Sequence, residues 1–190
     1  MKYRRTEIPD IVICEPKIFG DDRGYFVETF REDKLEEFLG FKIAFCQDNE
    51  SKSSYGVLRG LHYQLNPKAQ TKLVRVIEGE VLDVAVDIRE GSPTFGKHVA
   101  VKLSAKNRKQ LFVPRGFAHG FVVLSETATF IYKVDNFYSP ENDRGLSYND
   151  NLLNIDWELS IKDIKLSKKD TKQPGFLDAE YFDFKINLYE

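Results

Sequence analysis

The sequence predicts a mainly β fold, an antiparallel sandwich or barrel with a few short helices. Between residues 11 and 133, short runs rich in Val, Ile, Phe and Tyr are separated by Gly, Pro, Asn and Asp, the pattern of antiparallel strands joined by turns. The stretch VLDVAVDIR at 81–89 alternates most clearly, with aliphatic side chains on one face and Asp83 and Asp87 on the other. Successive side chains of a strand point to opposite faces. One face should therefore join the core, and the other should be polar or line a pocket.

The expected strands follow one another without a domain linker. They cover residues 11–19, 25–30, 43–49, 57–64, 73–79, 81–88, 98–103, 110–113, 119–123 and 128–133. The stretches GSPTFG at 91–96 and SPENDRG at 139–145 carry residues that reverse a chain, so they separate strands and not domains. We therefore expect a single domain over residues 1–190.

One helix and a C-terminal segment complete the predicted elements. In REDKLEEFLG at 31–40 the apolar residues fall on one helical face, and Gly40 is placed to end the helix. We expect this helix to cover an edge of the sheet. After Trp157 the alternation fades, and residues 158–190 should form a helical or irregular segment that packs on the barrel.

Composition excludes several classes of protein. The net charge of −2 argues against a nucleic-acid binder with a broad basic surface, because that mode of binding needs many Lys and Arg side chains. No apolar run reaches the roughly 20 residues of a membrane span, and the N-terminus MKYRRTEIPD lacks the apolar stretch of a signal peptide. We therefore expect a cytoplasmic protein without a membrane partner. Cys14 and Cys46 belong to no C-x-x-C pair, so both should be buried, inert thiols.

Two of the three histidines lie in unusual settings, His62 in LRGLHYQ and His119 in VPRGFAHGF. The Pro-x-Gly-x-x-His pattern ending at His119 resembles the second motif of cupins, a double-sheet jelly-roll family that usually binds a metal. The first cupin motif needs His-x-His and a nearby Glu, but Gln64 takes the place of the second His. Two imidazoles without further ligands make a poor metal site. The sequence thus predicts a cupin barrel without a metal, and a structural role for His98.

Basic side chains surround these histidines in the sequence. Arg23, Arg59 and Lys72, together with Tyr132, suggest a pocket for an anion, since Arg can hold a phosphate with two parallel hydrogen bonds. There is no Walker loop and no G-x-G-x-x-G, so side chains would have to hold any phosphate. The alternative is that these are ordinary surface charges.

Five blocks of the sequence resemble one family in order. They are FGDDRGYFVETF, FCQDNESKS, GVLRGLHYQ, QTKLVRVIEGEVLDVAVDIREGSPTFG and LFVPRGFAHGFVVLSE. Together they resemble the dTDP-4-dehydrorhamnose 3,5-epimerases, and the resemblance extends over residues 8–170. It implies a cofactor-free enzyme that inverts C3 and C5 of dTDP-4-dehydro-6-deoxy-D-glucose, the precursor of dTDP-L-rhamnose for cell-surface polysaccharide.

The resemblance also implies roles for the residues that would move protons. Inversion beside a carbonyl needs a base, a group that stabilises the enolate, and an acid on the opposite face. His62 would be the base and Tyr132 the acid, with Asp170 of LSKKD orienting His62. In the alternative reading, Ser167-x-x-Asp170 is a helix cap. The remaining expected roles are Asp83 as a second contact of His62, Lys72 beside the enolate oxygen, His119 as a hydrogen-bond donor, and Arg59 on the pyrophosphate.

Further residues match positions that bind the substrate in relatives. Arg23 and Glu28 match residues that reach into the neighbouring subunit's site, which implies a homodimer. The positions that match the nucleotide site are Gln47, Asn49, Tyr138, which would stack on the base, Asp143, where many relatives carry Glu, and Lys168. Val134 and Asp135 depart from many relatives, which have Cys or Ala and then Thr there, and this puts the detail of the substrate in doubt.

Three other functions stay open at this point. The first is an epimerase of one carbon only, or of a differently modified nucleotide-linked 4-keto sugar. The second is a non-catalytic sugar-binding cupin, which would need no acid and base on opposite faces. The third is a metal-dependent cupin oxygenase or isomerase.

Overall fold

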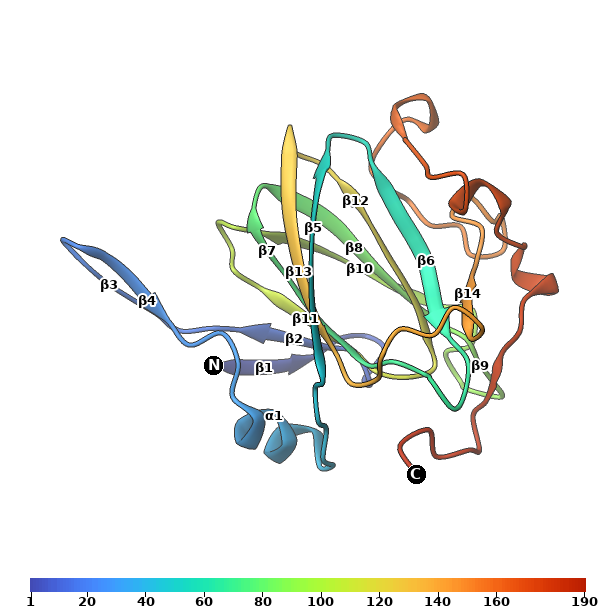
Figure 1. The fold of residues 1–190 in the computed structure, drawn as a ribbon, viewed down its shortest axis with the longest axis horizontal. Coiled ribbons are helices and arrows are strands. Elements are labelled where there is room, and N and C mark those ends of the chain that lie inside the picture. The colour runs from blue at the N-terminus through green and yellow to red at the C-terminus, as the bar shows by residue number, and fades with distance from the viewer.

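The computed structural model describes residues 1–190, and two antiparallel sheets face each other in it (Figure 1). The six-stranded sheet has the order β1 (Lys2–Arg5), β2 (Val12–Glu15), β11 (Gln110–Val113), β7 (Lys72–Glu78), β13 (Thr127–Val134) and β5 (Gln47–Ser54). The five-stranded sheet has the order β10 (His98–Ser104), β8 (Glu80–Asp87), β12 (Phe117–Val123), β6 (Leu58–Gln64) and β14 (Asp143–Gly145). The prediction of a mainly β, double-sheet fold is confirmed.

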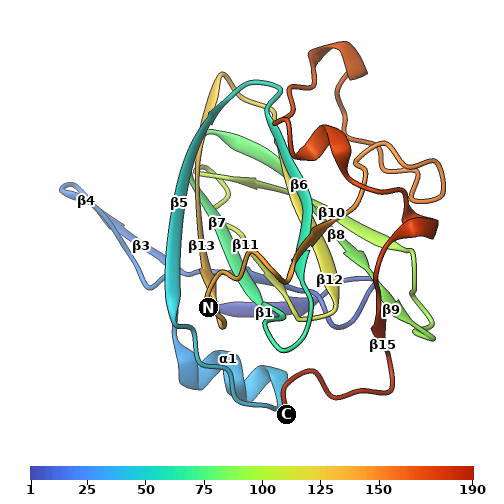
Figure 2. The same ribbon diagram turned by 45° about the vertical axis from the view of Figure 1, so that its right-hand side comes forward.

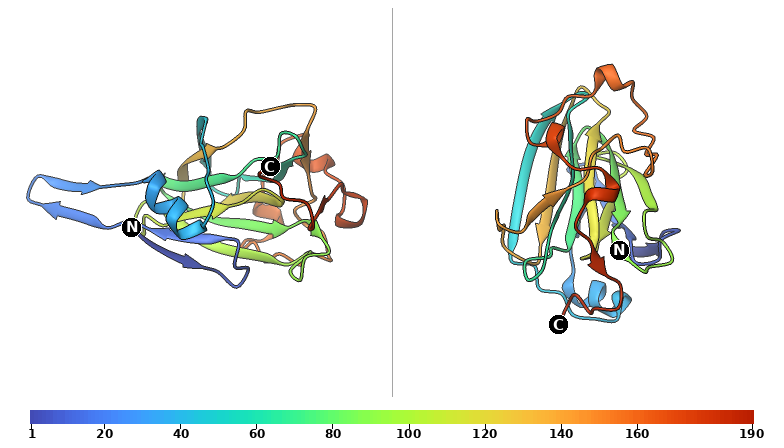
Figure 3. Two further views of the ribbon diagram at one scale, coloured as in Figure 1. Left: turned by 90° about the horizontal axis from the view of Figure 1, so that it is seen from below. Right: turned by 90° about the vertical axis from the view of Figure 1, so that its right-hand side faces the viewer.

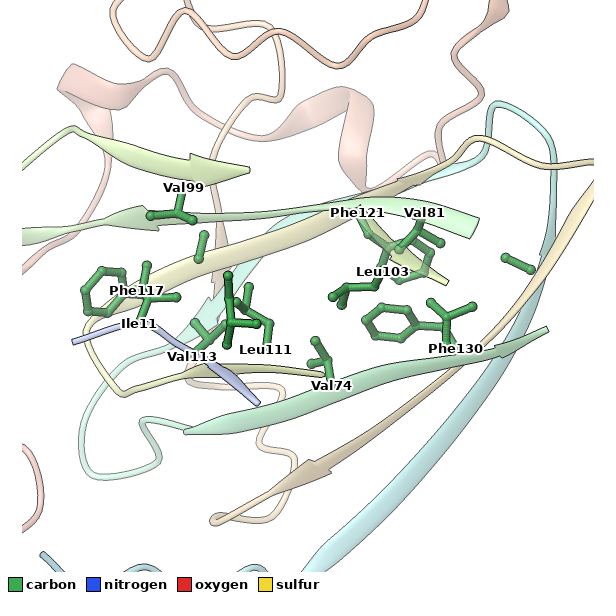
Figure 4. Close-up of a cluster of buried hydrophobic side chains, with 14 of the residues drawn as sticks. Ile11, Val74, Val81, Val99, Leu103, Leu111, Val113, Phe117, Phe121 and Phe130 are labelled. Atoms are coloured by element: carbon green, nitrogen blue, oxygen red, sulfur yellow. The ribbon is translucent and has the colours of Figure 1, made fainter. Parts of the chain in front are cut away.

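The space between the two sheets holds an apolar core (Figure 4). Val74 and Leu111 point into it from the six-stranded sheet, and Val81 points into it from the five-stranded sheet. Across this core the rings of Phe121 and Phe130 stack with centroids 4.1 Å apart. Such β-branched and aromatic side chains favour pleated strands and gain most from leaving water, so the core holds the sheets together.

The alternation in β8 places its aliphatic side chains on the outer face of the five-stranded sheet. Leu82, Val84, Val86 and Ile88 belong to a second buried cluster, which the C-terminal segment completes with Trp157, Phe176 and Phe182. This segment runs along the outside of the sheet (Figure 2). Its 3-10 turns are η1 (Ile161–Asp163), η2 (Asp170–Lys172) and η3 (Phe176–Asp178), and its short strand β15 (Phe182–Asp183) pairs with β9 (Arg89–Glu90). The opposite face of β8, with the fully buried Asp83, belongs to the barrel interior.

The predicted helix is α1 (Glu32–Leu39), and it ends as expected at Gly40, whose φ of 84° is left-handed. Leu35 packs in a third cluster with side chains of β2, β7 and β11. Phe38 stacks on Tyr3 of the edge strand β1, with ring centroids 5.2 Å apart. The helix thus lies against the six-stranded sheet and reaches its edge strand.

Three predicted strands differ from the structure by three or more residues, and the one predicted at 25–30 already ends at Val27. The run at 11–19 divides at Pro16 into β2 and β3 (Ile18–Asp21), and β3 forms with β4 (Gly24–Val27) a hairpin that projects from the body (Figure 3). A proline lacks the N–H that a ladder needs. The strand predicted at 43–49 is β5, at Gln47–Ser54. Its inward positions are polar, so the apolar residues just before it gave the wrong bounds.

Two smaller observations complete the fold. None of the helices is long and apolar enough to cross a membrane. Cys14 is buried as predicted, whereas Cys46 is exposed, so the prediction for Cys46 is wrong; both thiols are free. Cys46 lies just outside β5, beyond the cover of the core.

Candidate active site

A cavity of about 500 Å³ lies between the two sheets and receives polar side chains from both. The five-stranded sheet contributes Arg59 and His62 of β6 and His119 of β12; the six-stranded sheet contributes Asn49 of β5, Lys72 of β7 and Tyr132 of β13; the C-terminal segment contributes Asp170. Phe121 and Phe130 form part of its apolar wall. Seven of the residues predicted for the site thus meet in one cavity, with His62 and Tyr132 on opposite sheets.

The imidazole of His62 and the carboxylate of Asp170 are in direct contact, with Nε2 and Oδ1 2.5 Å apart. The second oxygen, Oδ2, accepts a hydrogen bond of 2.8 Å from the Ser167 hydroxyl. Burial favours the neutral form of Asp170, but the hydrogen bonds from His62 and Ser167 outweigh burial and hold the pKa of this carboxyl below its usual value. An ionised carboxylate only accepts hydrogen bonds. Nε2 therefore carries the proton, and Nδ1 of neutral His62 is left as the basic nitrogen.

Both predicted roles of Ser167-x-x-Asp170, the cap and the histidine partner, are present in the structure. The backbone N–H of Asp170 donates to the Ser167 hydroxyl oxygen at 3.1 Å, which is the geometry of a cap at the turn η2. The same aspartate binds His62 through its side chain. The cap and the histidine pair are therefore one structure.

A close approach of two strands places His62 beside His119. The residues form a register pair between β6 and β12, next to an irregularity in the ladder. Gly60 has a φ of +139°, and a Cβ there would lie 2.5 Å from the Cα of Gly120. Only glycine permits this backbone conformation and this contact, so the pair of glycines positions the two histidines.

Asp83 contacts His119 and not His62, which corrects the expectation. Nε2 of His119 lies 2.9 Å and 3.0 Å from the two oxygens of Asp83. Burial lowers the pKa of His119 and raises the pKa of Asp83. When a neutral imidazole donates Nε2–H to an ionised Asp83, the carboxylate is the one buried charge of the pair. This negative charge lies near the positive charge of Lys72. In that state His119 offers Nδ1 to the cavity as an acceptor, so the expected donor role would need a doubly protonated ring.

Lys72 is a cation of the cavity that has no carboxylate partner. Its Nζ donates to the backbone oxygen of His62 at 3.3 Å, and no carboxylate lies within ion-pair distance of it. Burial lowers its pKa to about 8. The ammonium therefore keeps donors available for an oxygen that becomes negative in the cavity.

Arg59 and Tyr132 lie near each other in the same cavity. Nε of Arg59 donates to the Ser53 hydroxyl at 3.1 Å, which orients the guanidinium. The hydroxyl of Tyr132 makes no hydrogen bond within the protein. Burial raises its pKa, against the opposite effect of Arg59, so at neutral pH the phenol carries a proton that it can give.

The other predicted nucleotide-binding residues lie outside the cavity lining. Gln47 donates to Asn49 Oδ1 at 2.8 Å. The hydroxyl of Tyr138 donates to Asp143 Oδ2 at 3.0 Å. The lysine that pairs with Asp143 is Lys169, while the predicted Lys168 is exposed. Gln47 thus contacts a residue that lines the cavity, whereas Tyr138, Asp143 and Lys169 form a separate polar group.

Arg23 and Glu28 also lie apart from the cavity of their own chain. Arg23 is in the projecting hairpin, its side chain is 89% exposed, and it pairs with Asp21. Glu28 follows the hairpin and is exposed. Their contribution to a neighbouring subunit's site stays a prediction.

Gln64 and Asp135 have roles in holding the fold. The Gln64 amide donates to two backbone oxygens and accepts from the backbone N–H of Ser139, with no contact to the cavity. No group of three or more His, Cys, Asp or Glu side chains is placed to hold a metal ion. Asp135 accepts from Thr71 N–H at 2.6 Å and from Arg115 Nε at 3.0 Å. Val134 is fully buried, and neither Val134 nor Asp135 lines the cavity. No direct contact therefore supports the expected influence of these two residues on substrate choice.

Sequence reasoning missed several polar residues of the cavity. Ser51 and Lys165 line it, and Ser53 and Ser167 hold Arg59 and Asp170 in place. All eight residues of QDNESKSS are polar, so no apolar alternation marked this strand, and only the structure shows that Gln47, Asn49, Ser51 and Ser53 face inward. This is a strand with a polar inner face.

Comparisons with known proteins show which family the chain belongs to. The family model for dTDP-4-dehydrorhamnose 3,5-epimerase matches residues 5–178. The enzyme of that name from Shigella flexneri is 57% identical over 96% of this chain and 99% of its own, and that of Pseudomonas aeruginosa is 53% identical with the same coverage.

Solved structures are similar over nearly the whole chain. The dTDP-4-dehydrorhamnose 3,5-epimerase from Elizabethkingia anophelis superposes with a TM-score of 0.92 at 55% identity, covering 95% of this chain and 99% of its own. The dTDP-6-deoxy-D-glucose-3,5-epimerase from Legionella pneumophila, solved with dTDP-4-keto-L-rhamnose, gives 0.93 at 47% identity, covering 97% and 99%.

Proposed function

The chain belongs to the dTDP-4-dehydrorhamnose 3,5-epimerase family and is thus an isomerase, and from this premise we propose its reaction and mechanism. It inverts C3 and C5 of dTDP-4-dehydro-6-deoxy-D-glucose and gives dTDP-4-dehydro-L-rhamnose. The observation that carries the mechanism is the His62–Asp170 pair in one cavity with Tyr132 of the opposite sheet. A base and an acid on opposite walls are what inversion requires.

The first step is proton removal beside the C4 carbonyl. Nδ1 of His62 takes the proton from carbon, the electron pair of that C–H bond forms a double bond between this carbon and C4, and the π pair of the C4 carbonyl moves to O4 as an enolate. Asp170 stabilises the imidazolium that results, as a buried carboxylate does in other histidine pairs. Lys72 donates an N–H to the negative O4, and the burial of Lys72 away from water strengthens this contact.

The second step returns a proton to the opposite face. Tyr132 gives its phenolic proton to the same carbon, the enolate collapses to the C4 ketone, and the configuration is inverted. His62 then releases its proton to solvent, and Tyr132 takes up a proton from solvent, before the second carbon reacts. These steps need no cofactor and no metal.

Substrate binding uses the residues around the cavity. Arg59 holds the pyrophosphate with its guanidinium, in accordance with the preference of Arg for phosphate. Asn49, Gln47, Asp143 and Lys168 bind the nucleotide, and Tyr138 stacks on its base. His119 binds the sugar within the cavity, with Asp83 fixing its ring.

The protein acts as a homodimer in this proposal. The hairpin of β3 and β4 exposes Phe19, Tyr25 and Phe26, an apolar surface that a second subunit would cover. Arg23 and Glu28 then complete the partner's site. Mixing Arg23→Ala with His62→Ala subunits tests this, because each mixed dimer regains one site with both residues intact. Recovery of activity supports shared sites; no recovery by dimers shown to be mixed contradicts them.

A specific observation favours one alternative, an epimerase of a single carbon. A 3'-monoepimerase from Streptomyces bikiniensis superposes with a TM-score of 0.88 at 29% identity. The same fold therefore accompanies inversion of one carbon in that protein. It was solved as a double variant that lacks one His and one Tyr, the residue types to which we assign proton transfer.

Isotope exchange decides between these functions. The purified protein is incubated with dTDP-4-dehydro-6-deoxy-D-glucose in deuterated water, and the sugar is analysed by NMR. Deuterium at C3 and C5 with the L-configured product supports the proposal. Label at one carbon favours the monoepimerase, and label at neither carbon refutes both. The cytoplasmic location stays a prediction.

A further inference from the structure

We propose that Ser167 is a positioning residue that holds the Asp170 carboxylate in the orientation in which it pairs with His62. The inference rests on the proposed function for its kinetic consequence. Its structural part concerns the Asp170–His62 contact, which exists in the protein without substrate.

One hydroxyl group fixes Asp170 at two points. The Ser167 O–H donates to Oδ2 of Asp170 at 2.8 Å, and its oxygen accepts the backbone N–H of Asp170 at 3.1 Å. With the backbone and one carboxylate oxygen held by the same group, rotation of the carboxylate is restricted. The other oxygen, Oδ1, is then directed at His62 Nε2, 2.5 Å away.

The segment before Ser167 is attached to the strand that carries His62. Lys165 accepts the backbone N–H of Leu58 at 2.9 Å and donates its own N–H to the oxygen of Gly56 at 2.8 Å. The backbone N–H of Thr171 donates to the Ser167 oxygen at 3.2 Å and closes the turn that contains Asp170. The backbone bonds thus fix Ser167 relative to β6, and Ser167 in turn fixes the Asp170 carboxylate relative to His62 on that strand.

Loss of the hydroxyl would leave one oxygen of a buried carboxylate without a donor. The Asp170 side chain is only 4% exposed, and Oδ2 has no other hydrogen-bond partner in the protein. A buried acceptor that loses its partner pays for its desolvation or moves toward water. If the carboxylate rotates toward water, Oδ1 turns away from His62. Because Ser167 itself is exposed, replacing it leaves the core intact.

The kinetic test compares three variants of the full chain. Ser167→Ala removes the hydroxyl, Ser167→Thr keeps it, and Ser160→Ala is the matched control, an exposed serine of the same segment whose side chain makes no hydrogen bond. We expect kcat of Ser167→Ala to fall about tenfold, the usual effect of one hydrogen bond to a charged group. KM should change less than twofold, and the melting temperature should fall by only about 2–8 °C, because one unsatisfied buried acceptor costs about 1–3 kcal/mol. Ser167→Thr should recover most of kcat, and Ser160→Ala should match the wild type.

A second readout needs no turnover. The ¹H–¹⁵N NMR signal of His62 Nε2–H in substrate-free protein reports the contact with Asp170. It should be shifted far downfield in the wild type, Ser160→Ala and Ser167→Thr, and move upfield or broaden in Ser167→Ala. An unchanged signal in Ser167→Ala overturns the positioning role, whether or not the epimerase reaction is correct. So does an unchanged kcat, or a rise of KM alone, which would make Ser167 a substrate contact. Failure of the proposed function is separate, since it appears as absence of isotope exchange in the wild type.

Discussion

Asp170 reaches His62 from 108 positions further along the chain, and their side chains meet at 2.5 Å. His62 lies on β6, whereas Asp170 begins a 3-10 turn of the C-terminal segment. That segment packs on the outer face of the five-stranded sheet through its own apolar side chains, including Trp157 and Phe176. The geometry of the base therefore depends on how this outer cluster packs.

The charge of Asp170 is the first property to test. Asp170→Asn keeps the size of the side chain and an oxygen for Nε2–H, but it removes the negative charge that stabilises the imidazolium. We expect kcat to fall by about 10²–10⁴-fold, as when an aspartate behind a catalytic histidine is neutralised. Steady-state kinetics measures this, with the exposed Asp178→Asn as control. A fall of less than threefold would show that the carboxylate is dispensable.

Tyr132 should affect the return of the proton more than its removal. Tyr132→Phe leaves His62 and Lys72 in place, so deuterium from solvent should still enter the sugar through the enolate. Inverted product should form at least about a hundredfold more slowly, within the usual range for loss of a general acid. NMR of the sugar in deuterated water measures exchange and inversion together, and Tyr148→Phe is the control. If inversion continues at the wild-type rate, another group is the acid.

The folded elements differ in how well the sequence predicts them. β11 was predicted with its observed bounds, and β8 within one residue, because their apolar residues alternate or cluster in the core. β5 was misplaced because it is an edge strand with a polar inner face, where side chains line a cavity and are not packed against apolar neighbours. Hydrophobic periodicity reports burial in the core, so it is weakest at the strand that builds the site.

The site shows a similar division. Motifs placed His62, Lys72 and Tyr132 in one cavity, but they did not predict which carboxylate contacts which histidine. The register pairs Asp83 with Phe121, two residues along β12 from His119, so the diagonal neighbour on the same face is His119. A strand pattern predicts the face of a side chain, whereas its partner depends on register.

Asp135 should contribute to stability and not to choice of substrate. Its side chain is 3% exposed and pairs with Arg115, whose side chain is 17% exposed. Asp135→Asn leaves Arg115 without its counter-charge, and we expect the free energy of unfolding to fall by roughly 2 kcal/mol. Urea unfolding measures this. The control is Asp48→Asn, which breaks the more exposed pair with Lys133 and should cost less than about 1 kcal/mol. A KM that changes severalfold with unchanged stability would restore a role in specificity.

Replacing Lys72 should stabilise the protein while it removes activity. Burial lowers the pKa of Lys72 from 10.5 to about 8, so the folded state disfavours the ammonium, and the cost is fully present below pH 8. It disappears as the pH rises from 8 to above 10.5, where lysine is neutral in both states. Lys72→Met should therefore raise the free energy of unfolding at pH 7 by up to about 3 kcal/mol, with the gain narrowing between pH 8 and 10.5. Urea unfolding at several pH values measures the difference, against Lys106→Met at an exposed site. A gain that is independent of pH would mean that Met packs better in the cavity, and a loss of stability would mean that the ammonium is satisfied there. The expected result would mean that the buried Lys72 ammonium destabilises the folded protein. Its positive charge becomes favourable only when an enolate forms beside it during the reaction.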